Sequence, residues 1–466
     1  MSFVIINFIL FLGLLTLFIF SNYKTISVAI FLFLNITLSY YVYTNFTSIK
    51  IIISDQFSYV FSDAISSYLI ILTIIISLVC LIWIISSKSW FELLLIILMT
   101  EICLFQIFST KNILIFYIFF ELSALPLLFL IIYKGPTFRR SIAFNYFLGY
   151  TLLGSLFFFI ALVVLFIFFN SFNVNDFNLQ ELTPGLQTII WFCFLITFFI
   201  KVPVLPFHLW LLEAHVEAPT LGSVILAALL LKIGGYGLFR FCLILFPEIS
   251  LYWSPLIITI ATISMLYSTF TAFVQLDMKR IIAYSSIAHM NASVIGLFSF
   301  NIFSIYGSVL NMLSHGFTSA ALFFLAGILY RKFHTKNLFY YGGLATFMPN
   351  FHFYFLFFIL SNVAFPGTFN FICEILILIG INNWSTILAL IFLLANSFVF
   401  LYCMLLFTKI CYGEVTSEFN EVIDINKYEI VLLAILGLCT ILFGIFPEDL
   451  LVFFEENIKI LYLKLG

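Results

Sequence analysis

The stretch that decides the fold runs from Lys201 to Arg240 and reads KVPVLPFHLWLLEAHVEAPTLGSVILAALLLKIGGYGLFR. Its second half is an apolar run with a lysine, Lys232, in its middle. Crossing a hydrocarbon core takes about 20 mainly apolar residues in a helix. A charge at the centre of such a helix costs about 2.5–3.5 kcal/mol to insert, so it needs a partner, water or a purpose. We therefore interpret this run as a membrane-spanning helix that carries a functional charge.

The composition extends this interpretation to the whole chain. The 466 residues are 64% hydrophobic and only 9% charged, whereas soluble domains are about 25% charged. A net charge of −2 and the lack of a Lys/Arg-rich tract argue against binding to nucleic acid. The eight cysteines occur singly, without metal-ligand spacing, so we expect them to be buried apolar fillers and expect no iron–sulfur centre. The 64 phenylalanines are typical of A/T-rich codons, a bias that favours synthesis inside an organelle.

The fold class that follows is an all-α polytopic membrane protein with about 14 transmembrane helices in a single membrane domain, residues 1–466. The first span is read as retained, because it has neither a basic n-region nor a small-residue cleavage site. The spans start near Phe3, Thr25, Ser66, Phe91, Asn112, Ser141, Gln187, Pro219, Tyr252, Arg280, Ile302, Met348, Trp384 and Tyr428. The tail, residues 447–466, mixes acids with an apolar face and is predicted to lie at the membrane interface.

Loop charges predict the orientation. On this division, the loops and span ends on one side hold 12 of the 19 Lys and Arg residues, and the other side with the tail holds five. Because the positive side is the inner one, both termini are expected on the opposite side, which in a mitochondrion is the intermembrane space.

Two spans are interrupted by proline. The seventh contains Pro203 and Pro206, and the twelfth is broken at Pro366-Gly367. Breaks at matching places in two halves are typical of inverted-repeat transporters. We predict two inverted five-helix repeats, residues 91–246 and 251–412, with broken helices seven and twelve.

Six titratable residues inside the predicted spans are the candidate site residues: Glu121, Lys201, Lys232, His289, His315 and Glu374. The proton affinity of a buried ammonium depends on a nearby carboxylate, and we expect Glu121 and Lys201 to form such a pair. A proton that passes from Lys201 to Lys232, and on through His289 and His315, would complete a relay ending at Glu374. The alternatives are structural ion pairs for the lysines, helix caps for the acids and satisfied core histidines.

A further buried acid and a pair of glycines also lie inside the predicted spans. Glu101 also lies inside a span, and a pair with Lys201 or Lys232 is its first interpretation. The glycines Gly234 and Gly235 in KIGGYG lack the strand and the Lys-Ser/Thr ending of a phosphate loop, so we expect close helix packing there.

The Lys201–Arg240 stretch resembles the signature of the antiporter-like membrane subunits shared by respiratory complex I, Mrp-type cation/proton antiporters and membrane-bound hydrogenases. Further stretches, FYIFFELSALP, AYSSIAHMN, LSHGFTSAALFFLAGILYRKFHT and FPGTFNFICE, extend the likeness over nearly the whole chain. In that family a Glu of span five and the lysines of spans seven and eight form a central hydrophilic axis, and here they match Glu121, Lys201 and Lys232. One departure is Leu212, where the family commonly has proline.

The resemblance also implies a branch of the family and a place in a larger enzyme. The span-twelve charge is a Lys in subunits 2 and 5 but a Glu in subunit 4, so Glu374 indicates the subunit 4 branch. The resemblance implies proton translocation within complex I, with no cofactor in this chain and with NADH, FMN, iron–sulfur clusters and ubiquinone in other subunits. Expected partners are membrane-arm subunits, chains 2 and 5 among them, and lipids including cardiolipin, in the mitochondrial inner membrane. An Mrp-type antiporter subunit and a structural scaffold are the alternative functions.

Overall fold

The computed structural model describes residues 3–19, 23–49, 63–85, 89–135, 139–413 and 423–448. Across these ranges the regular structure is helical and contains no strand. Most of the tail predicted to be interfacial, 449–466, lies outside the described residues. The α-helices are α1 (Phe3–Ile19), α2 (Lys24–Ile49), α3 (Ala64–Ile85), α4 (Trp90–Ser109), α5 (Ile113–Leu122), α6 (Leu125–Lys134), α7 (Arg140–Phe169), α8 (Pro184–Lys201), α9 (Leu209–Glu217), α10 (Thr220–Ile225), α11 (Leu231–Gly237), α12 (Pro247–Val274), α13 (Met278–Phe298), α14 (Ile302–Phe333), α15 (Leu344–Phe347), α16 (Pro349–Asn362), α17 (Phe369–Trp384), α18 (Thr386–Cys411) and α19 (Lys427–Ile445).

The helices confirm the all-α polytopic prediction. In the described part of the chain, 12 helical segments are long and apolar enough to cross a membrane. The shorter α1 and the pair α16–α17 occupy the two remaining positions of the fourteen expected spans. Helices are required here because a backbone in lipid must satisfy its own hydrogen bonds. Seven of the eight cysteines are buried, as expected of apolar fillers.

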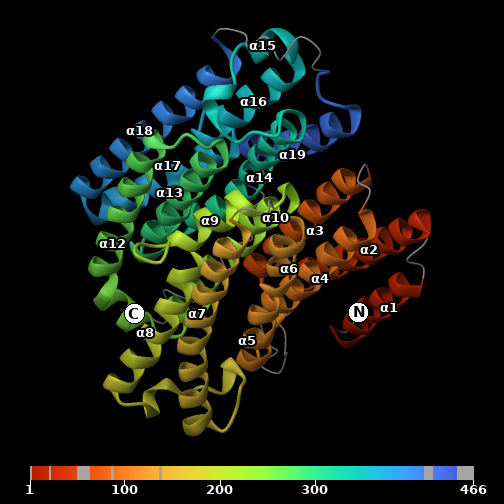
Figure 1. The fold of residues 1–466 in the computed structure, drawn as a ribbon. Coiled ribbons are helices and arrows are strands. Elements are labelled where there is room, and N and C mark those ends of the chain that lie inside the picture. Colours follow the sequence, from red (N-terminus) through yellow and green to blue (C-terminus); the bar gives the residue numbers. More distant parts are fainter. Residues whose placement is uncertain are drawn as a thin grey trace. The chain divides into compact units, whose positions relative to one another are not determined.

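The chain divides into two compact units, each considered by itself. The first unit comprises Met1–Phe129 and Ser155–Ile190, where α2 packs on α3 and α3 on α4. The second comprises Leu130–Gly154 and Trp191–Gly466. Its centre is formed by α13, α14 and α17, which pack on one another (Figure 1).

The two predicted helix breaks are confirmed. Helix α8 ends at Lys201, and Pro203 and Pro206 follow in a non-helical segment before α9 begins. Helix α16 ends at Asn362 and α17 begins at Phe369. Gly367, between them, has φ +90, a backbone conformation that glycine adopts without a Cβ penalty.

A third interruption was not predicted. The span that carries Glu121 is divided into α5 and α6 at Ser123-Ala124. Pro126, in the first turn of α6, has no N–H to donate to the carbonyl of Leu122, which accounts for the break. Glu121 therefore lies in the last turn of a half-helix.

The span around Lys232 is irregular in another way. Two π-helical stretches, Leu226–Leu230 and Leu238–Ile244, lie on either side of α11. Such stretches are rare and appear often at functional sites, because they re-aim side chains and carbonyls.

Two loops carry the same backbone pattern, one in each unit. Asn112 forms an isolated antiparallel bridge with Asn173, and Asp277 forms one with Asn337. Each bridge joins the residue before one helix to the loop that follows the next span. This recurrence supports the predicted repeats, whose boundaries stay a prediction.

Candidate functional site: a buried row of titratable side chains

Lys232 is the best-defined member of the site. Its side chain is fully buried on α11, and its Nζ donates a hydrogen bond to the carbonyl of Ala227, in the π-helical stretch one turn earlier. The same Nζ lies 2.8 Å from Nδ1 of His315 on α14. The irregular helix thus supplies one acceptor for the ammonium, and a neighbouring helix supplies a titratable base.

The glycines after Lys232 explain how close the neighbouring segments come. A Cβ on Gly234 would lie 2.6 Å from Cγ2 of Val202 and 3.0 Å from the Cβ of Lys201. A Cβ on Gly235 would lie 2.3 Å from Sδ of Met312, one turn before His315. Close helix packing, the interpretation made from the sequence, is confirmed. These glycines bring the break after Lys201 and the His315 helix against the Lys232 helix.

The other end of the row is formed by His289 on α13 and Glu374 on α17. Nδ1 of His289 lies 3.4 Å from Oε1 of Glu374, and both side chains are buried. The rings of His289 and His315 have centroids 5.7 Å apart. Asn311 donates hydrogen bonds to the backbone carbonyl of His289 and to Oγ of Ser293, both at 2.9 Å, so it ties α14 to the α13 turn that carries the histidine.

Asn396, on α18, was not singled out from the sequence. Its Nδ2 donates a 2.7 Å hydrogen bond to Oε2 of Glu374. The carboxyl of Glu374 therefore has His289 on one oxygen and Asn396 on the other. The signal was present, since Asn396 is a polar residue inside an apolar span, but only the packing of α18 on α17 gives it a partner.

The row can move a proton. Lys232 and His315 are both nitrogen bases, so their 2.8 Å contact requires one proton between them, on either the amine or the imidazole. His289 can pass a proton between the ring of His315 and the carboxyl group of Glu374. The Nε2 atoms of His289 and His315 are buried and have no hydrogen-bond partner among the described residues. These two nitrogens remain open to a proton from a bridging group.

The structure connects four of the six predicted residues and orders them differently from the chain. The connected residues run Lys232, His315, His289, Glu374, whereas the sequence order places His289 before His315. Lys201 is buried at the end of α8, and its Cβ lies against Gly234 on the Lys232 helix. Glu121 belongs to the first unit and Lys201 to the second, and their pairing stays a prediction.

A charged cluster holds helix α9 in place. Arg139 and Arg280 lie 3.6 and 3.3 Å from the Glu213 carboxylate. Nζ of Lys336 lies 3.5 Å from Oε1 of Glu217 and donates to the backbone carbonyl of Val216 at 2.6 Å. Burial lowers the pKa of Lys336, and the carboxylate of Glu217 opposes that shift. The cluster stabilises the segment that follows the break next to Lys201.

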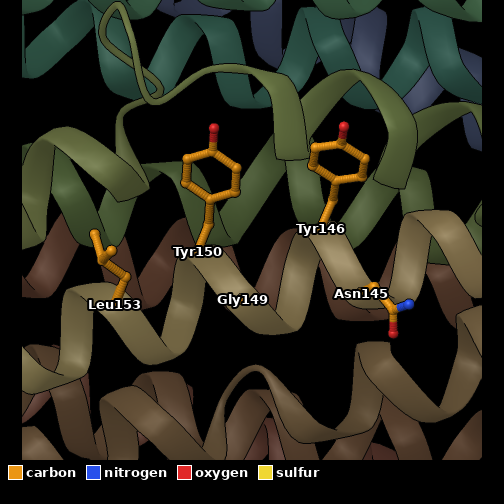
Figure 2. Close-up of a pocket in the computed structure, with 5 residues that line it drawn as sticks. All are labelled: Asn145, Tyr146, Gly149, Tyr150 and Leu153. Carbon is orange, nitrogen blue, oxygen red and sulfur yellow. The ribbon is translucent and has the colours of Figure 1, made fainter.

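One pocket of the described residues lies away from this row. A shallow pocket of about 330 Å³ lies on α7, lined by Asn145, Tyr146, Gly149, Tyr150 and Leu153. Figure 2 shows the rings of Tyr146 and Tyr150 side by side on one face of the helix, pointing the same way. The pocket's lining contains none of the six titratable residues.

Comparison with known proteins gives one family. Residues 110–400 match the family described as NADH:quinone oxidoreductase/Mrp antiporter, TM. The NADH-ubiquinone oxidoreductase chain 4 of Marchantia polymorpha is 42% identical over 341 residues, covering 72% of this chain and 68% of the relative. The NADH-quinone oxidoreductase subunit M of Rickettsia prowazekii is 40% identical over 358 residues, covering 76% and 72%.

Solved structures share the fold. A chain of respiratory complex I from Thermus thermophilus is 27% identical and superposes with a TM-score of 0.78, covering 86% of this chain and 85% of that one. A chain of the Mrp complex from Dietzia sp. is 16% identical with a TM-score of 0.85, covering 98% of each chain. At that identity the second likeness shows the fold alone.

Proposed function

This chain belongs to the NADH:quinone oxidoreductase/Mrp antiporter family of membrane subunits, and from that membership we propose that it conducts protons as the chain 4 subunit of a mitochondrial NADH:ubiquinone oxidoreductase. The observation that carries the proposal is the 2.8 Å contact between Nζ of Lys232 and Nδ1 of His315. Relatives named chain 4 or subunit M support the assignment to this enzyme. In this proposal NADH, FMN, iron–sulfur clusters and ubiquinone bind other subunits, and this chain holds no redox cofactor.

The proton path follows the contacts. Lys201 takes up a proton when the charge of Glu121 acts on it and passes the proton toward Lys232. The proton then moves along the Lys232–His315 contact and crosses to the imidazole of His289. From there it reaches Glu374, which releases it. The carbonyl of Ala227 supports the protonated state of Lys232, because it accepts one of the three ammonium protons.

The surroundings are part of the proposal. We place the chain in the mitochondrial inner membrane, with both termini on the intermembrane-space side. Most of the loop Lys and Arg residues are predicted on the other side of the membrane, and the positively charged side is the inner one. Its partners are other membrane-arm subunits, chains 2 and 5 among them, and lipids such as cardiolipin. Epitope tags at the two termini, probed with antibody in sealed inner-membrane vesicles of known orientation, test this placement.

The test of conduction uses the intact complex in sealed vesicles. The variant Lys232→Met removes the ammonium and keeps most of the volume, so the complex should assemble but pump fewer protons per NADH oxidised. Lys409→Met is the matched control, because Lys409 is an exposed lysine at the end of α18. An assembled Lys232→Met complex that pumps like the control contradicts the relay and favours the scaffold alternative.

A sodium gradient distinguishes the Mrp-type alternative from the proposed function. A cation/proton antiporter moves protons when a sodium gradient is applied without NADH. Vesicles that hold the intact complex should show no such movement. The 16% identity to the Mrp chain carries the fold only, whereas the relatives at about 40% identity are chain 4 and subunit M proteins.

A further inference from the structure

Glu101 is a buried carboxyl group that lies outside the proton path. It sits on α4 in the first unit and is 2% exposed. Its Oε2 lies 3.5 Å from Nδ2 of Asn35 on α2, and its Oε1 lies 3.2 Å from Oγ of Ser77 on α3. Oγ of Ser77 in turn lies 3.0 Å from Oδ1 of Asn35. The three side chains form a closed ring that joins α2, α3 and α4.

The orientation of the Asn35 amide follows from its backbone neighbour. Nδ2 of Asn35 lies 3.1 Å from the carbonyl oxygen of Phe31. A carbonyl oxygen only accepts hydrogen bonds, so the amide nitrogen must face it. Oδ1 of Asn35 therefore faces Ser77 and needs a donor there, since the whole ring is buried.

Ser77 has one hydroxyl proton for three acceptors: Oε1 of Glu101, Oδ1 of Asn35 and the carbonyl oxygen of Ile74, which lies 2.9 Å from Oγ. The Ile74 carbonyl lies inside α3 and accepts the N–H four residues later, so it does not need this proton. If Glu101 is ionised, the hydroxyl must donate to Oε1 of Glu101, and Oδ1 of Asn35 is left without a donor. If Glu101 carries a proton, its O–H donates to Oγ of Ser77, the hydroxyl of Ser77 donates to Oδ1 of Asn35, and the amide of Asn35 donates to Oε2. Only the protonated acid completes the ring.

The charge around Glu101 leads to the same state. Among the described residues no Lys, Arg or His forms an ion pair with Glu101, and its hydrogen-bond partners are two neutral side chains. A buried carboxylate without a cation is costly, as is a buried acceptor without a donor. Both costs are absent when the group is neutral.

We propose that Glu101, Asn35 and Ser77 form a proton-binding site in the first unit, separate from the relay, in which Glu101 holds one proton as a neutral carboxylic acid. The bound proton links three helices through a cyclic set of hydrogen bonds. The first interpretation of Glu101, as the partner of a buried lysine, has no role in this proposal. The site is independent of the proposed function, because it rests only on the contacts of the three side chains.

Infrared spectroscopy of the intact complex tests the protonation state. The spectrum of the native complex minus that of Glu101→Gln should contain the carbonyl band of a protonated carboxyl group at neutral pH. In Ser77→Ala that band should move to higher frequency, because the acid O–H loses its acceptor. Glu92→Gln is the matched control, since Glu92 is an exposed carboxyl on the same helix. Its removal should leave the band of Glu101 in place.

Assembly provides a second, independent measurement. A glutamine at position 101 can donate to Ser77 and accept from Asn35, so Glu101→Gln should assemble like the native chain. Glu101→Leu leaves the serine and the asparagine without partners, and the amount of assembled complex should fall several-fold. A native spectrum identical to that of Glu101→Gln in the carboxylic-acid region overturns the proposal, and so does a Ser77→Ala band at the native frequency. Equal loss of assembly in the Gln and Leu variants would also overturn it, because it would show that the charge itself is required.

Discussion

Replacing His289 and Glu374 one at a time and together measures how strongly the two side chains act on each other. Their facing atoms are 3.4 Å apart. At an effective dielectric constant of about 20, two unit charges at that distance attract by about 5 kcal/mol. Residues in direct contact usually show coupling energies of about 0.5–3 kcal/mol. These energies are smaller than the Coulomb energy because solvent and neighbouring groups relax when one charge is removed. We expect about 1–3 kcal/mol, which corresponds to roughly 5- to 150-fold in rate.

The assay is the initial rate of NADH-driven proton translocation by the reconstituted complex. We compare the native chain with His289→Gln, with Glu374→Gln and with the double variant. If a proton passes between the two groups, the double variant should be little slower than the slower single variant. Glutamine at position 374 still accepts from Asn396, so that contact is retained.

A control pair removes general effects of the substitutions. The control combines Glu374→Gln with Lys409→Gln, a change at an exposed residue at the end of α18. The effects of these two substitutions on the translocation rate should multiply. If the effects of His289→Gln and Glu374→Gln also multiply, the contact carries no proton. The His289 end of the row would then be structural.

Three further outcomes are expected. Lys201→Met should lower pumping at least about tenfold in an assembled complex, and Lys201→Arg should be nearly as harmful because a guanidinium does not release its proton; native-like pumping by either variant would count against the relay. Gly234→Ala should destabilise the assembled complex by about 1–3 kcal/mol, since the new Cβ meets Val202 at 2.6 Å, and an unchanged thermal unfolding curve would contradict that packing. Asn396→Leu should leave assembly intact and slow pumping several-fold, because Glu374 loses the 2.7 Å donor; the measurement is the proton translocation rate, and a native rate would make the hydrogen bond incidental.

The spans and the two proline breaks were predictable because each depends on local chemistry. Apolar runs must be helical in lipid, and Pro203 removes a donor wherever it occurs. The break at Ser123-Ala124 could have been found in the same way, since Pro126 is plain in the sequence. The π-helical stretches beside Lys232 leave no such signal.

The order of the row could not be predicted, because sequence position does not say which helices touch. His315 reaches Lys232 because Gly235 allows Met312, one turn away on α14, to approach. His289 reaches Glu374 because α13 packs on α17 across the second unit. The ring around Glu101 was missed for the same reason, since its three members lie on three separate helices.

The π-helical stretch from Leu226 to Leu230 also has a consequence for chain length. A π turn takes up one residue more than the α turn it replaces, so a span that contains one is a residue longer than a regular helix over the same rise. Deleting Ala228 should therefore convert the stretch to α-helix without changing the register of the residues on either side. The span would still cross the membrane, but the carbonyl of Ala227 would be taken up by the regular ladder and lost to Lys232. At this point in the chain, a change in length alone should alter proton conduction while the fold persists.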